Sequence, residues 1–351
     1  MSMSMSMSMS LNNLNLNLGA ADSRMGYGGP RYNTEDFPKL MPVPFPAVIP
    51  LPTPYPPDWD PELRAWAYVR EFIVGIPWPA ANDPVTSAYT QLQASPLFVP
   101  PTVTPPPAGA IPAANPLTPA QLSNQVLSVL NASIDRADRA LEIADQATGQ
   151  GALNYWTGML RIDPSKDKHT FLLMLVTRKI GEFVAMGLKD IYKMRRPAQV
   201  FPWIMPLFDG PDTPSFPSSH SLQAHLISAA LMLALPNAEI WPPRGWPPPP
   251  PPVWPPPPLV WPPPPALPPG WPPVWPPPVP AGETARALDH LAGRVAYNRE
   301  VAGVHYPMDS EAGFYVALFC LFALYAAAAG GTAPLFNQLI IDARAELVNL
   351  P

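Results

Sequence analysis

Cysteine and positive charge are both scarce in this chain. Cys320 is the only cysteine among 351 residues, so no disulfide can form within the chain. It lies in an apolar run, Leu-Phe-Cys-Leu-Phe, which predicts a buried and inert thiol. Lysine and arginine number 21 against 26 aspartate and glutamate residues, and the formal net charge is −5. Because nucleic-acid-binding surfaces are usually basic, we expect no nucleic acid partner, and any functional cations must be concentrated locally.

Long apolar runs are also few. Residues 313–329 carry no charge, but their 17 positions only reach the lower limit of the roughly 17 to 25 residues that cross a bilayer. No series of five or six such runs occurs, so we expect a soluble helical domain and not a membrane protein. Residues 1–28 alternate Met-Ser and then Leu-Asn, without the basic start and apolar core of a secretory signal. The compartment stays open, with the cytoplasm as the default and the periplasm as the alternative.

Proline, in contrast, is present in large excess. It occupies 58 of the 351 positions, far above the usual share of about 5%. Residues 1–58 are of low complexity and then rich in proline, and residues 241–281 punctuate proline runs with tryptophan. Such stretches cannot build a packed core and favour polyproline II structure. We therefore expect a disordered N-terminal region (1–58) and a helical domain (59–351) that is interrupted by a Trp/Pro-rich insertion (241–281).

Hydrophobic periodicity predicts that most of the remaining chain is helical. Apolar residues are suitably spaced over 60–76, 169–193, 222–233, 285–301, 308–329 and 333–350, and the proline-rich residues 77–116 are expected to be a linker. Thr118-Pro119-Ala120-Gln121 has the form of a capping box, which predicts a helix from here to about Gly149. The expected core face of that helix consists of Leu122, Val126, Leu130, Ile134, Ala137, Leu141 and Ala144.

One polar stretch is a candidate for chemistry. Residues 298–309 read NREVAGVHYPMD, which contains the pattern R-x5-H-x3-D. An imidazole four residues before a carboxylate can share a helical or turn face with it, so Asp309 can hold one ring nitrogen of His305 while the other nitrogen faces a substrate. The pattern therefore makes His305 a candidate nucleophile.

Two earlier stretches complete an ordered set of motifs. Residues 189–197 read K-x6-R-P, and residues 217–220 read Pro-Ser-Ser-His directly before an apolar run, which predicts a helix N-terminus able to bind phosphate. With these motifs the chain resembles the superfamily of type 2 phosphatidic acid phosphatases, bacterial class A acid phosphatases and vanadium haloperoxidases, whose signature is K-x6-RP, PSGH and SR-x5-H-x3-D. Ser219 stands where that signature has glycine, and Asn298 stands where it has serine.

The resemblance implies an all-α helical bundle and a phosphatase that needs no metal or other cofactor. In such an enzyme His305 would form a phosphohistidine, Asp309 would orient it, and His220 would act as general acid and base. The residues that would hold the phosphate of a small-molecule ester are Lys189, Arg196, Ser218, Ser219 and Arg299. Vanadate can occupy the same kind of site, with His305 as its ligand.

Three functions remain open at this point. Hydrolysis of phosphate monoesters is favoured because removing the 41-residue insertion leaves 37 of the 78 residues between His220 and Arg299, a spacing similar to that of the class A acid phosphatases. The second function is that of a vanadate-dependent haloperoxidase. The third is a degenerate core that displays residues 241–280 to a proline-reading domain, although expanded low complexity is the simpler interpretation of this stretch.

Overall fold

The computed structural model describes residues 60–78, 83–94, 117–235 and 282–348. Every regular element within these ranges is helical, which confirms the expected all-α class. The predicted N-terminal region (1–58) and the insertion (241–281) lie outside the described residues. The helices in chain order are α2 (Pro61–Val74), α3 (Pro84–Ala94), α4 (Pro119–Ala132), η2 (Ser133–Asp135), α5 (Arg136–Asp145), α6 (Gly149–Leu160), α7 (Lys168–Tyr192), α8 (Pro197–Val200), η3 (Pro202–Ile204), α9 (Ser219–Ala234), α10 (Glu283–Val301), α11 (Pro307–Ala329) and α12 (Pro334–Leu347).

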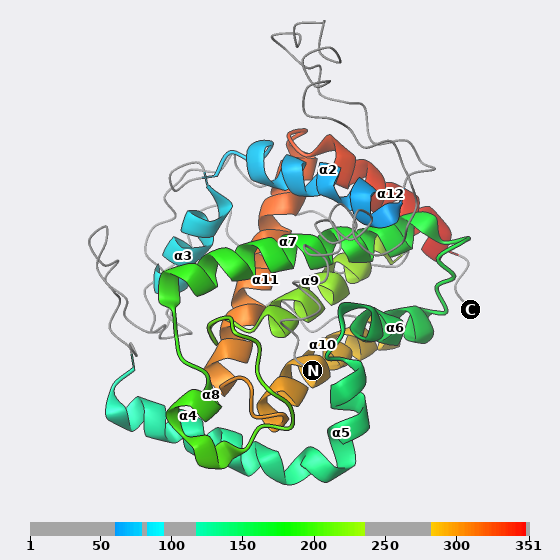
Figure 1. The fold of residues 1–351 in the computed structure, drawn as a ribbon. Coiled ribbons are helices and arrows are strands. Elements are labelled where there is room, and N and C mark those ends of the chain that lie inside the picture. The colour runs from blue at the N-terminus through cyan, green and yellow to red at the C-terminus, as the bar shows by residue number, and fades with distance from the viewer. Residues whose placement is uncertain (1–59, 79–82, 95–116, 236–281, 349–351) are drawn as a thin grey trace, which may run out of the picture.

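Helix α9 forms the centre of the bundle, with α7, α10 and α11 packed around it (Figure 1). Its sequence is apolar on nearly every side, which is the pattern of a helix buried in a core. Glycines on two neighbouring helices allow close packing against Leu222. A Cβ added at Gly313 of α11 would lie 2.8 Å from the Leu222 nitrogen, and one at Gly181 of α7 would lie 3.0 Å from its Cδ2. The N-terminus of α9 is therefore held firmly between α7 and α11.

Helices α2 and α12 pack against α7, and α12 also contacts α9 (Figure 1). A carboxylate of α2 caps the N-terminus of α12, and a carboxylate of α12 caps the N-terminus of α7, where main-chain N–H groups lack helical partners. Glu71 of α2 accepts bonds from the N–H groups of Leu335 (2.8 Å) and Phe336 (2.9 Å) at the start of α12. Glu346 of α12 accepts a 2.7 Å bond from the N–H of Thr170 at the start of α7. These bonds brace α7, whose far end carries Lys189.

The expectation of a linker over residues 77–116 is wrong for part of that range, because α3 lies within it. Asp83 caps this helix by accepting a 2.7 Å bond from the N–H of Thr86. Pro84 is compatible with the helix because the first helical residue needs no hydrogen-bonded N–H. Ala88 and Leu92 are buried against the core. A high proline content thus concealed one short helix.

The helix predicted from Thr118 to about Gly149 is also different in the structure. The capping box is present, with the Gln121 N–H donating to Thr118 Oγ1. The turn Ser133–Asp135 then breaks the helix into α4 and α5, and Gly149 begins α6 instead of ending the segment.

Helix α5 presents the face opposite to the one expected. Ile134 and Leu141, which were expected in the core, are 80% and 89% exposed. Beside the buried Ile143, the inward side of α5 carries Arg136: its Nε donates to the Val301 carbonyl at 2.7 Å, and its Nη1 donates to two carbonyls of η3 and the residue after it. Gly303 has a φ of +80°, and a Cβ there would lie 2.6 Å from Arg136 Nη2. Glycine therefore makes room for the arginine that anchors α5.

Helix α11 is the one described helix whose length and hydropathy would suffice for crossing a membrane, a test that core helices also pass. One side of it is buried in the bundle, including Ala312, Val316 and Leu324. Cys320 lies on the same side, so the prediction of a buried thiol is confirmed, and burial raises its pKa.

Candidate active site

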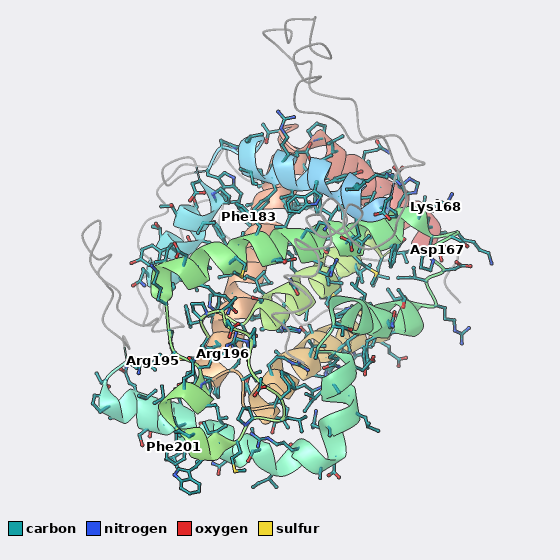
Figure 2. The ribbon with its side chains drawn as sticks, in the orientation of Figure 1. Asp167, Lys168, Phe183, Arg195, Arg196 and Phe201 are labelled. Atoms are coloured by element: carbon teal, nitrogen blue, oxygen red, sulfur yellow. The ribbon has the colours of Figure 1, made fainter. Side chains whose placement is uncertain are left out.

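The residues of the three motifs meet where the ends of several helices converge. Lys189 lies in the last turn of α7. Arg196 lies directly before α8, in the segment between these two helices, where Figure 2 labels it. Ser218 is the N-cap of α9, Arg299 lies in the last turn of α10, and Asp309 lies in the first turn of α11. Sequence-distant segments thus bring cations, a carboxylate and helix N-termini to one place.

His305 and Asp309 form a buried hydrogen-bonded pair. The distance between His305 Nδ1 and Asp309 Oδ2 is 3.0 Å. The same carboxylate oxygen accepts a bond from the N–H of Tyr306 at 3.0 Å and a bond from the hydroxyl of Ser215. When Asp309 is ionised its Oδ2 can only accept, so His305 carries its proton on Nδ1. The lone pair is left on Nε2.

Arg196 lies beside that lone pair. Its Nη1 is 3.3 Å from His305 Nε2, and because a guanidinium can only donate, Nε2 must be the acceptor. Burial lowers the pKa of His305 well below its ordinary value, and the positive charges of Arg196 and Lys189 lower it further. His305 is therefore a neutral imidazole at neutral pH, which is the form that can act as a nucleophile.

Main-chain carbonyls hold the cations from α7 and the loop that follows it. Lys189 Nζ donates to the carbonyls of Pro214 (2.6 Å) and Ser215 (2.9 Å). Arg196 Nε donates to the carbonyl of Thr213 at 2.9 Å, and Nη1 donates to that of Val304 at 2.7 Å. Residues 213–215 lie outside the three sequence motifs. Closely spaced prolines just before the Pro-Ser-Ser-His motif were the available signal, since proline favours extended chain and leaves carbonyls unpaired.

Arg299 is different because most of its donors have no protein partner. Its side chain is fully buried, and Nη2 donates to the carbonyl of Ile143 at 3.0 Å. Within the described part of the chain, Nε and Nη1 have no hydrogen-bond acceptor. Burial lowers its pKa only to about 10, so the guanidinium stays charged. Buried charged donors without an acceptor are costly, which indicates a place for an anionic ligand.

His220 and the two serines before it lie at the start of α9. His220 and Ser219 are half-buried, and one ring nitrogen of His220 donates to the main-chain carbonyl of Gln146. Burial and then the charge of Arg299 lower the pKa of His220 well below its ordinary value. Ser219 is not among the residues with positive φ, so its backbone does not require glycine. Ser218 is buried, its Oγ accepts a bond from the N–H of Ser221, and its own N–H donates to the carbonyl of Asp309.

The electrostatics show that these groups belong to one cluster. The charges of Lys189, Arg196 and Arg299 all act on His305, and the same three charges act on His220. Burial lowers the pKa of Lys189 well below its ordinary value, and even without the charge of Lys189 the guanidinium groups of Arg196 and Arg299 outnumber the single carboxylate of Asp309. Glu142 also acts on Arg299, but both of its oxygens already accept bonds from Arg294 at 2.6 Å.

This arrangement can bind a dianion, attack it with one neutral imidazole and exchange a proton through the other. A comparison of the full chain with models of known protein families finds no match, and a comparison with characterised proteins finds none either.

Proposed function

We propose that the protein is a phosphoric monoester hydrolase that acts through a phosphohistidine intermediate. The observation that carries the proposal is that Arg299 Nε and Nη1 have no hydrogen-bond partner among the described residues, in a buried cluster whose cations outnumber its one carboxylate. A phosphate monoester dianion carries two negative charges on non-bridging oxygens that accept such bonds. It would compensate both the missing bonds and the missing charge.

In the proposed complex the phosphate oxygens accept bonds from Arg299 and from the N–H groups at the start of α9. Lys189 and Arg196 add positive charge from the other side, held in place by the carbonyls of residues 211–215. The hydroxyl of Ser218 supports the first turn of α9 through Ser221. The phosphorus atom would then lie in front of His305 Nε2.

The reaction takes place in two displacement steps. His305 Nε2 forms a bond to phosphorus while the bond from phosphorus to the ester oxygen breaks, and His220 gives its proton to that oxygen so that the alcohol leaves. Asp309 stabilises the charge that develops on the imidazole of His305. Water then attacks phosphorus, His220 takes the proton from this water, and the bond to Nε2 breaks to release phosphate.

The second step returns His220 to its protonated form, but the first turnover needs a proton on it beforehand. In the free enzyme burial and the neighbouring cations hold the pKa of His220 low. A bound dianion offsets those charges and raises the pKa again. Substrate binding and protonation of His220 are therefore coupled.

A vanadate-dependent haloperoxidase is the second candidate, because the same donor set fits the oxygens of vanadate. His305 Nε2 offers the lone pair that would ligate vanadium, and the free N–H groups of Arg299 would hold an oxygen. Bound vanadate supplies the activation of hydrogen peroxide for halide oxidation. A degenerate core that presents residues 241–280 to a proline-reading domain is the third candidate, and that stretch lies outside the described residues.

An assay on p-nitrophenyl phosphate tests these candidates. We expect hydrolysis by the wild type, inhibition by vanadate, and a loss on the order of 10³-fold or more in His305→Ala. His290→Ala, which removes an exposed histidine of α10, is the matched control and should retain activity. If no variant hydrolyses esters but the vanadate-loaded wild type brominates a dye with peroxide, the haloperoxidase function replaces the phosphatase. Inactivity in both assays would favour the third candidate, a degenerate core that presents residues 241–280 to a proline-reading domain.

A further inference from the structure

Two buried amides next to the site take no direct part in the reaction proposed above. Gln146 is the C-cap of α5 and Asn298 lies in α10, and both are fully buried. Asn298 Nδ2 donates to Gln146 Oε1 at 2.8 Å. Burying two amides is costly unless their hydrogen bonds are made, so a pair in this position calls for a reason.

The amides belong to a chain of hydrogen bonds whose direction is determined at both ends. Arg139 Nη1 donates to Asn298 Oδ1 at 3.0 Å, and Gln146 Nε2 donates to Glu142 Oε1 at 3.0 Å. Glu142 is in turn held by Arg294. Because an arginine can only donate and a carboxylate can only accept, neither amide can turn over without losing its bonds. The pair therefore fixes the end of α5 against α10.

The last turn of α5 is the part of the protein that holds two groups of the site. The carbonyl of Ile143 accepts the bond from Arg299 Nη2, and the carbonyl of Gln146 accepts the bond from His220. Carbonyls in the last turn of a helix lack helical partners and carry partial negative charge, so they suit both donors. Any shift of this turn relative to α10 would move His220 relative to Arg299.

We propose that Gln146 and Asn298 are positioning residues for His220, and that they align it for proton transfer to the leaving group. The inference rests on the proposed phosphatase activity. The carbonyl of Gln146 keeps one ring nitrogen of His220 as the N–H, which leaves the other nitrogen for the ester oxygen. A serine at position 298, as in the signature, has one short hydroxyl in place of a two-ended amide. It would lose the bridge between Arg139 and Gln146.

The leaving group of the ester separates this role from a general effect on folding. p-Nitrophenolate is a good leaving group and needs little protonation, whereas phenolate is poorer and depends on the acid. For Asn298→Ala we expect kcat/KM for phenyl phosphate, which reports only the steps up to release of the alcohol, to fall by about 10- to 100-fold, and kcat/KM for p-nitrophenyl phosphate to fall by less than about 3-fold. Gln146→Met keeps the volume of the side chain and removes its bonds, so it should give the same selective loss.

Gln338→Ala removes an exposed amide of α12 that bonds to Asp342, and it is the matched control with no expected effect on either ester. An equal loss on both esters in Asn298→Ala and Gln146→Met would overturn the positioning role and leave the phosphatase intact. If Asn298→Ala does not fold, the comparison of the two esters with Gln146→Met decides the question. A wild type that hydrolyses neither ester would overturn the proposed function itself.

Discussion

At the scale of single residues, the carboxylate of Asp309 has two oxygens in very different surroundings. Oδ2 accepts bonds from His305, Tyr306 and Ser215, whereas Oδ1 is buried and has no partner among the described residues. Burial raises the pKa of Asp309 to about 6, and the bonds from Ser215 and Tyr306 act in the opposite direction. The site therefore depends on a carboxylate that is ionised only above mildly acidic pH.

Ser215→Ala should move the acid limb of the pH profile. The ionised form of Asp309 holds the proton of His305 on Nδ1, so activity is present above the pKa of Asp309 and is lost as the pH falls through it. Removing the hydroxyl that stabilises the carboxylate raises this pKa above about 6. A bond worth about 1 kcal/mol corresponds to a shift of about one pH unit in the limb of kcat/KM. Ser228→Ala removes another buried serine hydroxyl, which lies on α9 and bonds to α6 and α10, and it should leave the acid limb of the pH profile in place. An unshifted limb in Ser215→Ala would show that Asp309 does not control it.

Arg299→Met should separate stability from function. Without phosphate we expect the free energy of unfolding of the variant to be no lower than that of the wild type. Removing an unpaired buried charge stabilises the fold by several kcal/mol, whereas losing the bond to the carbonyl of Ile143 costs only about 1 kcal/mol. In phosphate at 100 times its dissociation constant, the wild type should gain about 2.7 kcal/mol in urea unfolding, and the variant should gain little. Arg195→Met, on an exposed neighbour of Arg196, is the control that should behave as the wild type. A variant that phosphate still stabilises fully would remove Arg299 from the anion site.

At the scale of elements, α5 shows what hydrophobic periodicity can and cannot predict. The spacing of Ile134 and Leu141 identified an apolar stripe correctly, but a stripe does not state which side meets the core. Arg136 and Arg139 lie outside that stripe, yet they turn inward to carbonyl and amide oxygens near the end of α10. Buried arginines with such partners are stable. The partners of Arg136 are main-chain carbonyls, whose positions cannot be read from the residue letters.

A pair of alanine substitutions tests the orientation of α5. Leu141→Ala should change the free energy of unfolding by less than about 0.5 kcal/mol because the side chain is almost fully exposed. Ile143→Ala should cost about 2 to 5 kcal/mol because that side chain is fully buried. Urea denaturation of the full chain measures both values. The reverse order would mean that the side with Leu141, and not the side with Ile143, is buried.

The same contrast applies to the site. The motifs have fixed spacing and fixed residue types, so the sequence was enough to predict the charged and imidazole side chains of the site. The structure brings these side chains together: Lys189, Arg196, Arg299, His220 and His305. The groups that hold these side chains could not be predicted in this way, because they are main-chain carbonyls of residues 211–215 and of the last turn of α5. Their positions depend on how distant helices pack, which is a property of the folded chain. Gln146 is the clearest case, because nothing about a single glutamine distinguishes it in the sequence.

At the scale of the whole molecule, α9 and α10 are joined by direct contacts and by bonds to further helices. Ser228 of α9 donates to the carbonyl of Leu288 in α10 at 2.8 Å, and Trp156 of α6 donates to the same serine at 2.8 Å. Arg344 of α12 holds the carbonyl of Leu233 near the end of α9 at 2.7 Å. These contacts join four helices directly, so they should persist when the intervening sequence changes.

Replacing residues 241–281 by a Gly/Ser linker of about ten residues should therefore preserve both the fold and the site. Shortening the connection about threefold lowers the entropy cost of closing it, which adds about 1 kcal/mol to stability. For a domain of this size that corresponds to a rise in Tm of about 2 to 4 °C, with kcat/KM on p-nitrophenyl phosphate unchanged within about 3-fold. A second variant with a 41-residue Gly/Ser linker separates length from sequence. If both variants lose activity, the Trp/Pro-rich stretch contributes to the site. If both keep it, the catalytic domain is complete without that stretch, because the helices that carry His220 and Arg299 contact each other directly.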